Sequence, residues 1–245
     1  MKPGGRRACR TNNTPTRSYL NVFSYLLDGP RSEPANGEAP EKLVILLHGL
    51  GADGNDLIAL APLFSQILPE AAFVAPNAPE ACDMAPSGYQ WFSLQEREPQ
   101  ALHKGAEAAR TSLDAFIDQE LERHGLEEKD LVVVAFSQGT MIALYTCLRR
   151  PNACAGIVGF SGLLIDNGRL DEEIRSRPPI MLIHGEEDPV VPFECMDAAE
   201  KTLSACGVPV QTHARPELEH GIDQDGLVMA AGFLQAVFDK ELEQG

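Results

Sequence analysis

The sequence predicts an α/β protein with a mostly parallel central sheet and helices on both faces. From Lys42 onward, short apolar runs alternate with stretches of helical spacing, which is the pattern of βαβ units. The runs at residues 42–48 and 131–136 are apolar at consecutive positions, as expected for strands buried on both faces. With 245 residues, 44% of them hydrophobic and 23% charged, the chain has the size and composition of an ordinary globular domain.

The individual elements follow from the same patterns. Gly125 and Pro151 mark two helix ends, because glycine favours the left-handed helix cap and proline cannot continue a helix. A helix capped by Asn55 or Asp56 is expected to run to about Leu68. We further expect strands at residues 42–48, 72–75, 131–136, 157–160, 180–184 and 208–212, and helices at residues 101–124, 138–149, 193–206 and 227–242.

The segment from Pro76 to Gln100 has no regular spacing and is rich in proline, glycine and serine. A loop of this length in a compact domain is usually functional or disordered. It contains the only tryptophan, Trp91, next to Phe92, and disordered loops rarely carry aromatic pairs. We therefore expect a packed loop that borders a site.

Charge divides the chain into two unequal parts. Residues 1–27 hold five basic side chains and no acidic one, so the rest carries 15 basic and 36 acidic side chains, a net charge of −21. A body this acidic repels nucleic acids and anionic membrane faces. We expect residues 1–20 to be a disordered basic extension, in preference to a transit or signal peptide, and residues 21–245 to form a single domain.

The six cysteines form no C-x-x-C pair and no metal-ligand spacing, and several lie in apolar runs. We therefore expect them to be reduced and the protein to be cytoplasmic. No segment approaches the roughly 20 apolar residues of a membrane span, so stable membrane insertion is not expected. The sequence leaves the oligomeric state open, a homodimer included.

Ser137 is the candidate nucleophile. It lies between the apolar run 131–136 and a predicted helix, at a strand–turn–helix corner that would lift its hydroxyl clear of the sheet. The usual pattern at such a corner is G-x-S-x-G, and here Ala135 replaces the first glycine. Ser161 is the rival, but Leu163 stands where the second glycine should be. Ser161 is therefore more simply interpreted as a structural serine at the C-terminal edge of the sheet.

The segment His48-Gly49-Leu50-Gly51 ends the first buried strand. Acyl transfer needs two donors for the developing oxyanion, and glycines let backbone N–H groups approach a substrate. The candidates are the N–H groups of Leu50 and of Gln138, the residue after the nucleophile. We interpret His48 as a structural residue rather than a base, because it precedes the serine in the chain.

An acid and a base follow Ser137 in the expected order. Asp188 comes after a late strand and before a rigid Pro-Val-Val-Pro segment, which favours it over Glu186 and Glu187. His220 lies in the loop before the last helix, and apart from His213, which belongs to a strand, it is the only histidine after Asp188. All these residues follow strands, so they are expected at the C-terminal edge of one sheet.

Seven motifs together resemble the phospholipase/carboxylesterase family of α/β hydrolases, which includes bacterial carboxylesterases, lysophospholipases and acyl-protein thioesterases. They are LHGLGADGNDL (47–57), APNAP (75–79), QWFSL (90–94), FSQG (136–139), GFSGLL (159–164), HGEEDPVVP (184–192) and EHGID (219–223). The resemblance runs from about Leu26 to the C-terminus. It departs from the family at Ala135 and Thr140, where glycine is usual, so the geometry at the serine and the reaction rate are the properties affected.

The resemblance implies an α/β-hydrolase fold with Ser137 as nucleophile, Asp188 as acid and His220 as base, and Leu50 and Gln138 as oxyanion donors. It also implies that Trp91 and Leu163 or Leu164 border the acyl pocket. The substrate expected is a small-molecule ester or thioester.

No cofactor is expected, because the sequence has no H-E-x-x-H motif, no P-loop and no dinucleotide-binding glycine motif, and no metal site is expected either. Carboxylesterase activity is the primary prediction. A lysophospholipase or a protein-deacylating thioesterase is the alternative within the class. A catalytically silent binding protein is the alternative from another class.

Overall fold

The computed structural model describes Met1 and residues 27–242, with side chains to residue 239. Apart from Met1, the expected extension at residues 1–20 lies outside the described residues. The central feature is a seven-stranded sheet in the order β1-β3-β2-β6-β7-β8-β9, in which β1 alone is antiparallel to its neighbour. Its strands are β1 (Arg31–Ser32), β2 (Lys42–Leu47), β3 (Ala71–Val74), β6 (Leu131–Phe136), β7 (Gly156–Phe160), β8 (Ile180–Gly185) and β9 (Val210–Arg215).

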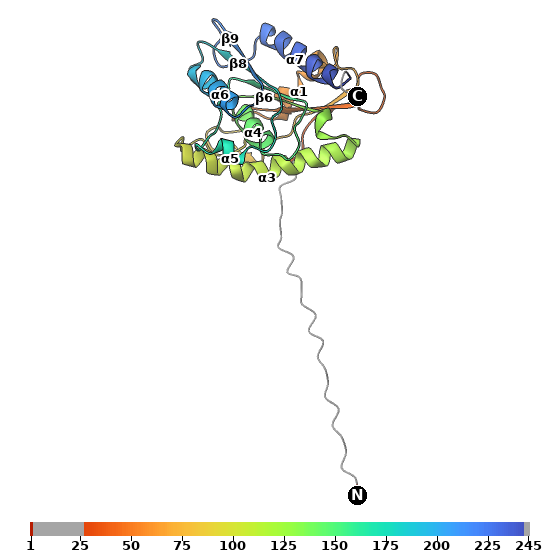
Figure 1. Ribbon diagram of the computed structural model, residues 1–245, viewed down its shortest axis with the longest axis horizontal. Coiled ribbons are helices and arrows are strands. Elements are labelled where there is room, and N and C mark those ends of the chain that lie inside the picture. Colours follow the sequence, from red (N-terminus) through yellow and green to blue (C-terminus); the bar gives the residue numbers. More distant parts are fainter. Residues whose placement is uncertain (2–26, 243–245) are drawn as a thin grey trace.

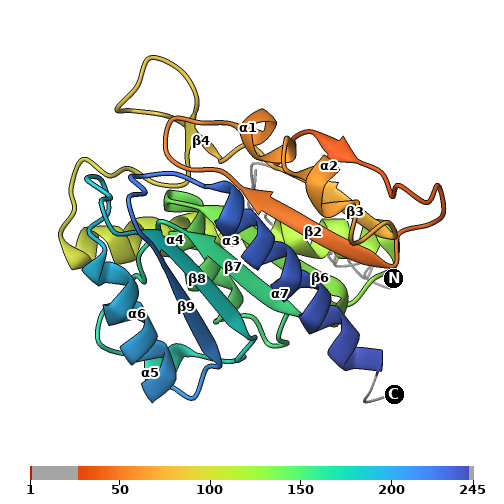
Figure 2. The ribbon, with the colours of Figure 1, turned by 90° about the horizontal axis from the view of Figure 1, so that it is seen from above.

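Helices cover both faces of this sheet, as the sequence predicts (Figure 1). They are α1 (Gly54–Ile58), α2 (Ala61–Phe64), α3 (Pro99–His124), α4 (Gln138–Cys147), α5 (Leu170–Glu173), α6 (Glu194–Ala205) and α7 (Gln224–Leu242), with a 3-10 turn, η1, at Glu128–Asp130. Figure 2 shows α7 lying across one face of the sheet while α3 and α4 lie behind it. The mostly parallel α/β architecture is thereby confirmed.

The central strands are apolar at consecutive positions because each face of the sheet has its own core. In β2, Leu43, Ile45 and Leu47 belong to the core beneath α3, α4 and α6. Val44 and Leu46 belong to the core beneath α1, α2 and α7. Successive strand side chains point to opposite faces, so a strand with a core on both sides needs apolar residues throughout.

Several expected elements differ from the structure in their bounds, among them the last helix, α7, which begins at Gln224 and not at residue 227. The single helix expected up to about Leu68 is two short helices, α1 and α2, and its cap is Asp53, whose side chain accepts a hydrogen bond from the N–H of Asn55 at 2.7 Å. Pro62 lies in the first turn of α2, and a proline is tolerated there but not inside a continuous helix. The last strand, β9, lies at Val210–Arg215, later than the expected 208–212.

The loop expected between Pro76 and Gln100 contains a small two-stranded sheet. Its strands are β4 (Glu80–Ala81) and β5 (Tyr89–Gln90), which pair antiparallel. Immediately after β5, Trp91 and Phe92 are buried in the core on the α3–α4 face. The loop is thus anchored by its aromatic pair, which agrees with a packed rather than a disordered segment.

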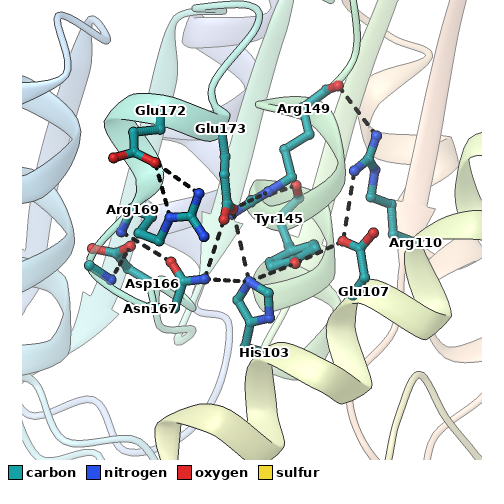
Figure 3. A network of polar contacts seen from close by, with 11 residues as sticks. His103, Glu107, Arg110, Tyr145, Arg149, Asp166, Asn167, Arg169, Glu172 and Glu173 are labelled. Carbon is teal, nitrogen blue, oxygen red and sulfur yellow. Dashed lines mark hydrogen bonds and ion pairs between the residues drawn. The ribbon is translucent and has the colours of Figure 1, made fainter.

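A polar network ties the segment after β7 to helices α3 and α4 (Figure 3). The Nδ2 group of Asn167 donates to Nε2 of His103 at 2.8 Å, and Nη2 of Arg149 lies 2.6 Å from Oε2 of Glu173. The guanidinium of Arg149 also stacks over the ring of Tyr145, 3.7 Å from its centroid. These contacts hold residues 161–173 against α3.

Among the residues that the structure describes, no helix has the length and apolar character needed to cross a membrane.

Candidate active site

Ser137 lies at the sharp turn between β6 and α4. Its backbone adopts φ 53° and ψ −118°, a conformation that non-glycine residues rarely take. Two backbone hydrogen bonds of Ser137 hold the turn. Its N–H donates to the carbonyl of Phe160 at 2.8 Å, and its carbonyl accepts from the N–H of Met141. The strand-to-helix corner expected from the sequence is therefore present.

Close packing around this corner explains which residues it tolerates. A Cβ at Gly139 would lie 2.1 Å from the carbonyl oxygen of Leu47, so the second glycine of the pattern is required. Thr140 stands where the resemblance leads one to expect glycine. Its hydroxyl lies 3.0 Å from the carbonyl oxygens of both Ala135 and Phe160 and shares its single proton between them. The threonine is accommodated because its neighbours across the turn lack side chains: a Cβ at Gly159 or Gly162 would come within 2.5 Å of it.

The structure brings Ser137, His220 and Asp188 together in a hydrogen-bonded chain. The Nε2 atom of His220 lies 3.0 Å from Oγ of Ser137, and its Nδ1 atom lies 2.7 Å from Oδ2 of Asp188. The ring of His220 is also 4.9 Å from the ring of Phe136, centroid to centroid. This is the arrangement in which a histidine takes a proton from a serine and an aspartate orients the histidine.

The surroundings of Asp188 keep it ionised. Burial alone would raise the pKa of this carboxyl, but hydrogen bonds from His220 and from the backbone N–H groups of Val191 and Val190 outweigh it and hold the pKa below its ordinary value. The two N–H groups donate to Oδ1 at 2.9 and 2.8 Å. The Pro-Val-Val-Pro segment therefore fixes the carboxylate through its backbone.

The rival residues lie elsewhere. Ser161 also has a positive φ, 45°, but within the described residues its buried hydroxyl has no hydrogen-bond partner. Glu186 and Glu187 are exposed on the turn before Asp188. His213 lies in β9, paired in register with Ile183.

The two expected oxyanion donors lie on either side of the serine. Gln138 is the first residue of α4, and the first N–H groups of a helix have no partner within it. Leu50 lines the same cavity as Ser137. The loop that carries it is locked in place, because the N–H of Gly51 donates to the carbonyl of Tyr89 at 2.8 Å and a Cβ at Gly88 would meet the carbonyl of Gly51 at 2.0 Å.

His48 fits the structural role interpreted from the sequence. Its Nδ1 atom lies 2.7 Å from the carbonyl of Gly49 and its Nε2 accepts from the N–H of Ala78 at 2.9 Å. Burial lowers the pKa of the ring against smaller opposing effects of the Gly49 carbonyl and nearby aspartates, so His48 is neutral. The ring fastens the Leu50 loop to the segment after β3.

Trp91 lies in the core rather than in the cavity wall. Only 1% of the residue is exposed, and its indole N–H donates to the carbonyl of His48 at 3.0 Å. The side chain of Gln138 accepts from the N–H of Trp91 at 3.0 Å and donates to the carbonyl of Phe92 at 2.6 Å. Trp91 is absent from the lining of the cavity next to Ser137. The geometry therefore favours an anchor that joins the loop after β2 to the start of α4.

The cavity beside Ser137 has a volume of about 350 Å³. Its wall combines Ser137 and His220 with apolar side chains, among them Leu50, Met141 and Leu163. A second cavity of about 270 Å³ shares Leu102 and Leu163 with it and is also lined by Leu164. Leu102 and Leu163 thus border both spaces, while Leu164 borders only the second one.

Several lining residues were not singled out from the sequence. Leu94, Val190 and Val191 belong to motifs around Trp91 and Asp188, so their position in the chain was a usable signal. Met141 lies inside α4 and Arg97 in the irregular loop, and nothing in their local sequence marks them. His184, in β8, lies 3.2 Å from Asp188 and was likewise not singled out.

Comparison with known proteins places this site in a family. The model of the phospholipase/carboxylesterase family matches residues 34–238. The chain belongs to this family. It is therefore an α/β hydrolase of the ester-hydrolysing type, as the sequence motifs predict.

Individual relatives agree with the phospholipase/carboxylesterase assignment. The crystal structure of esterase PE8 superposes with a TM-score of 0.82 at 43% identity and covers 86% of this chain and 99% of its own. Acyl-protein thioesterase 1 of Saccharomyces cerevisiae is 34% identical over 61% of this chain and 71% of the yeast protein. Esterase YpfH of Escherichia coli is 25% identical over 82% of this chain and 84% of its own length.

Proposed function

We propose that this member of the phospholipase/carboxylesterase family hydrolyses carboxylic esters of small molecules through a covalent acyl-enzyme. Ser137 is the nucleophile, His220 the general base and Asp188 the acid that orients it. The observation that carries the proposal is the chain of short contacts from Ser137 through His220 to Asp188, 3.0 and 2.7 Å long.

In the first step, His220 accepts the proton of Ser137 as Oγ attacks the acyl carbon. The negative charge that develops on the carbonyl oxygen is stabilised by the N–H groups of Leu50 and Gln138. The bond to the alcohol breaks, and the alcohol leaves with the proton from His220. Water then attacks the acyl-enzyme with His220 again as base, which releases the acid and restores Ser137.

The apolar cavity next to Ser137 supports an acyl group of hydrocarbon character, because a buried hydrocarbon gains free energy in proportion to the surface removed from water. Long-chain thioesters or lysophospholipids are the second candidate. The observation that favours them is the second cavity, which shares Leu102 and Leu163 with the first and offers further apolar space next to it. The described cysteines are free thiols, which supports our proposal that the protein works in the reducing cytoplasm.

The nucleophile is tested by paired serine variants. Ser137→Ala is expected to lose several orders of magnitude in kcat on p-nitrophenyl esters and to lose labelling by a fluorophosphonate, with an unchanged Tm. Ser161→Ala is the matched control, since it also alters a serine of positive φ after a neighbouring strand, and it should keep most activity. An inactive Ser161→Ala together with an active Ser137→Ala would overturn the assignment. A wild-type protein that no fluorophosphonate labels would favour the catalytically silent binding protein instead.

A further inference from the structure

His184 is a buried histidine that the proposed reaction does not use, and its ring lies against the triad acid. It is in strand β8, with 2% of the residue exposed. Its Nε2 atom lies 3.2 Å from Oδ2 of Asp188 and 2.9 Å from the carbonyl oxygen of Val191. The ring of Phe193 stands edge-on to it at 6.1 Å between centroids.

These neighbours determine which nitrogen of His184 carries a proton. A carbonyl oxygen and an ionised carboxylate only accept hydrogen bonds, so Nε2 must be the donor. Its N–H donates to the carbonyl of Val191, and the same nitrogen lies 3.2 Å from Oδ2 of Asp188. The N–H of Val191 in turn donates to Oδ1 of Asp188 at 2.9 Å. His184 therefore packs against the acid and also holds the backbone that binds it.

As a consequence, one carboxylate oxygen of Asp188, Oδ2, lies next to two histidine rings. Oδ2 of Asp188 lies 2.7 Å from Nδ1 of His220 and 3.2 Å from Nε2 of His184. Oδ1 is held by the N–H groups of Val190 and Val191. Rotation of the carboxylate away from His220 would break contacts at both oxygens.

The other titratable groups near Asp188 have little electrostatic effect on its carboxylate, because they are neutral or exposed to solvent. The thiol of Cys195, on α6, has a pKa raised by its burial and also by Glu194 and Asp188, so it is neutral. Glu186 and Glu187, on the turn before Asp188, are exposed to solvent. Within the described residues, His184 and His220 are thus the two side chains whose ring nitrogens lie next to the carboxylate of Asp188.

We propose that His184 is a positioning residue for the triad acid: its Nε2–H, which is bonded to the Val191 carbonyl and lies 3.2 Å from Oδ2, holds the carboxylate of Asp188 in place and draws part of its charge away from His220. This inference rests on the proposed triad. His184 does not itself line the cavity beside Ser137, so it acts through Asp188 and through Val191, whose carbonyl accepts its N–H.

Loss of this donor has two expected effects. A less constrained carboxylate aligns His220 less well, and a misplacement of about 1 Å can lower catalysis by about 10- to 100-fold, with the effect in kcat rather than in KM. The carboxylate also concentrates its charge on the one remaining ring and so favours the imidazolium form of His220. Because the base must be neutral to accept the proton of Ser137, the acid limb of the kcat/KM profile moves to higher pH.

The test compares three variants of the full chain on p-nitrophenyl butyrate between pH 5 and 9, with Tm measured for each. His184→Leu removes the donor. His184→Gln restores an amide N–H at about the distance of Nε2, without a titrating ring. His213→Gln is the control, because it alters a histidine of the adjacent strand β9 that does not contact Asp188.

The expected result is a lower kcat and a displaced acid limb for His184→Leu, recovery of both in His184→Gln, and wild-type behaviour of His213→Gln. If His184→Leu does not fold, His184→Asn replaces it, because its amide is too short to reach Asp188. A variant without the donor that keeps the wild-type pH profile would overturn the inference, even if its Tm falls. Ser137→Ala, assayed in parallel, separates the two ideas: activity in that variant refutes the triad itself, whereas its inactivity beside unaltered His184 variants refutes the role of His184 alone.

Discussion

Trp91→Ala is expected to destabilise the protein without changing which acyl chains it prefers. The indole is buried in the core beneath α3 and α4, with 1% of the residue exposed. Its N–H satisfies the carbonyl of His48, and its backbone N–H is held by the side chain of Gln138. The substitution therefore removes a large packed side chain and leaves a buried carbonyl without its donor.

The magnitude follows from these contacts. Truncation of a buried tryptophan to alanine lowers the free energy of unfolding by about 3–5 kcal/mol, and the orphaned carbonyl favours the upper part of that range. In a protein of 150–250 residues, each kcal/mol corresponds to about 2–4 °C. The Tm of Trp91→Ala is thus expected to fall by roughly 6–20 °C. Activity at low temperature should fall for all substrates alike, because the two segments that Trp91 joins carry the proposed oxyanion donors, which serve every ester.

The assay combines thermal unfolding, followed by circular dichroism, with kcat/KM for p-nitrophenyl esters of increasing chain length. Leu163→Ala is the matched comparison, because Leu163 lines both cavities and is only partly buried. It should shift the preference toward longer chains with a small change in Tm. The reasoning would be refuted by a Trp91→Ala protein with a nearly wild-type Tm and an altered chain-length preference, since that result identifies a pocket wall.

Two further predictions concern the residues around the serine. Thr140→Val should lower the free energy of unfolding by about 1–3 kcal/mol, because the carbonyls of Ala135 and Phe160 lose the hydroxyl that they share. Thr140→Ser keeps the hydroxyl and should retain most of the stability. Equal losses of stability in both variants, measured by thermal unfolding, would count against the hydrogen bonds. Because His48 is neutral and buried, the stability of the protein should decline as the pH falls. Burial lowers the pKa of His48 below its ordinary 6.5, so below about that pH the unfolded chain binds more protons than the folded one. The Tm of the wild type should therefore drop between pH 7.5 and 5.5, and by less in His48→Asn; an equal drop in both proteins would assign the effect to other groups.

The sequence was most informative where structure depends on neighbouring residues. Strand β6 has the predicted bounds because an apolar run with a core on each face has no other stable place in an α/β sheet. The end of α3 at Gly125, with φ 67°, follows from the conformational freedom of glycine. Pro62, in contrast, interrupts the helix that the apolar spacing predicts up to Leu68, because proline has no N–H to donate within a helix.

By itself, the sequence determined the fold class, the hydrolase family and the candidate nucleophile, acid and base. The fold class follows from alternating strand and helix patterns, and the family and the candidate residues follow from short motifs at the ends of strands. Only the tertiary structure placed Trp91 in the core, outside the lining of the cavity, and His184 against Asp188. Residues 91 and 48 meet, as do 137 and 220, because β2, β6, β7 and β8 pair side by side and bring their C-terminal ends to one edge. At that edge, packing between segments far apart in the chain decides which side chains face the core and which face the cavity. The spacing of residues along the sequence does not predict this packing.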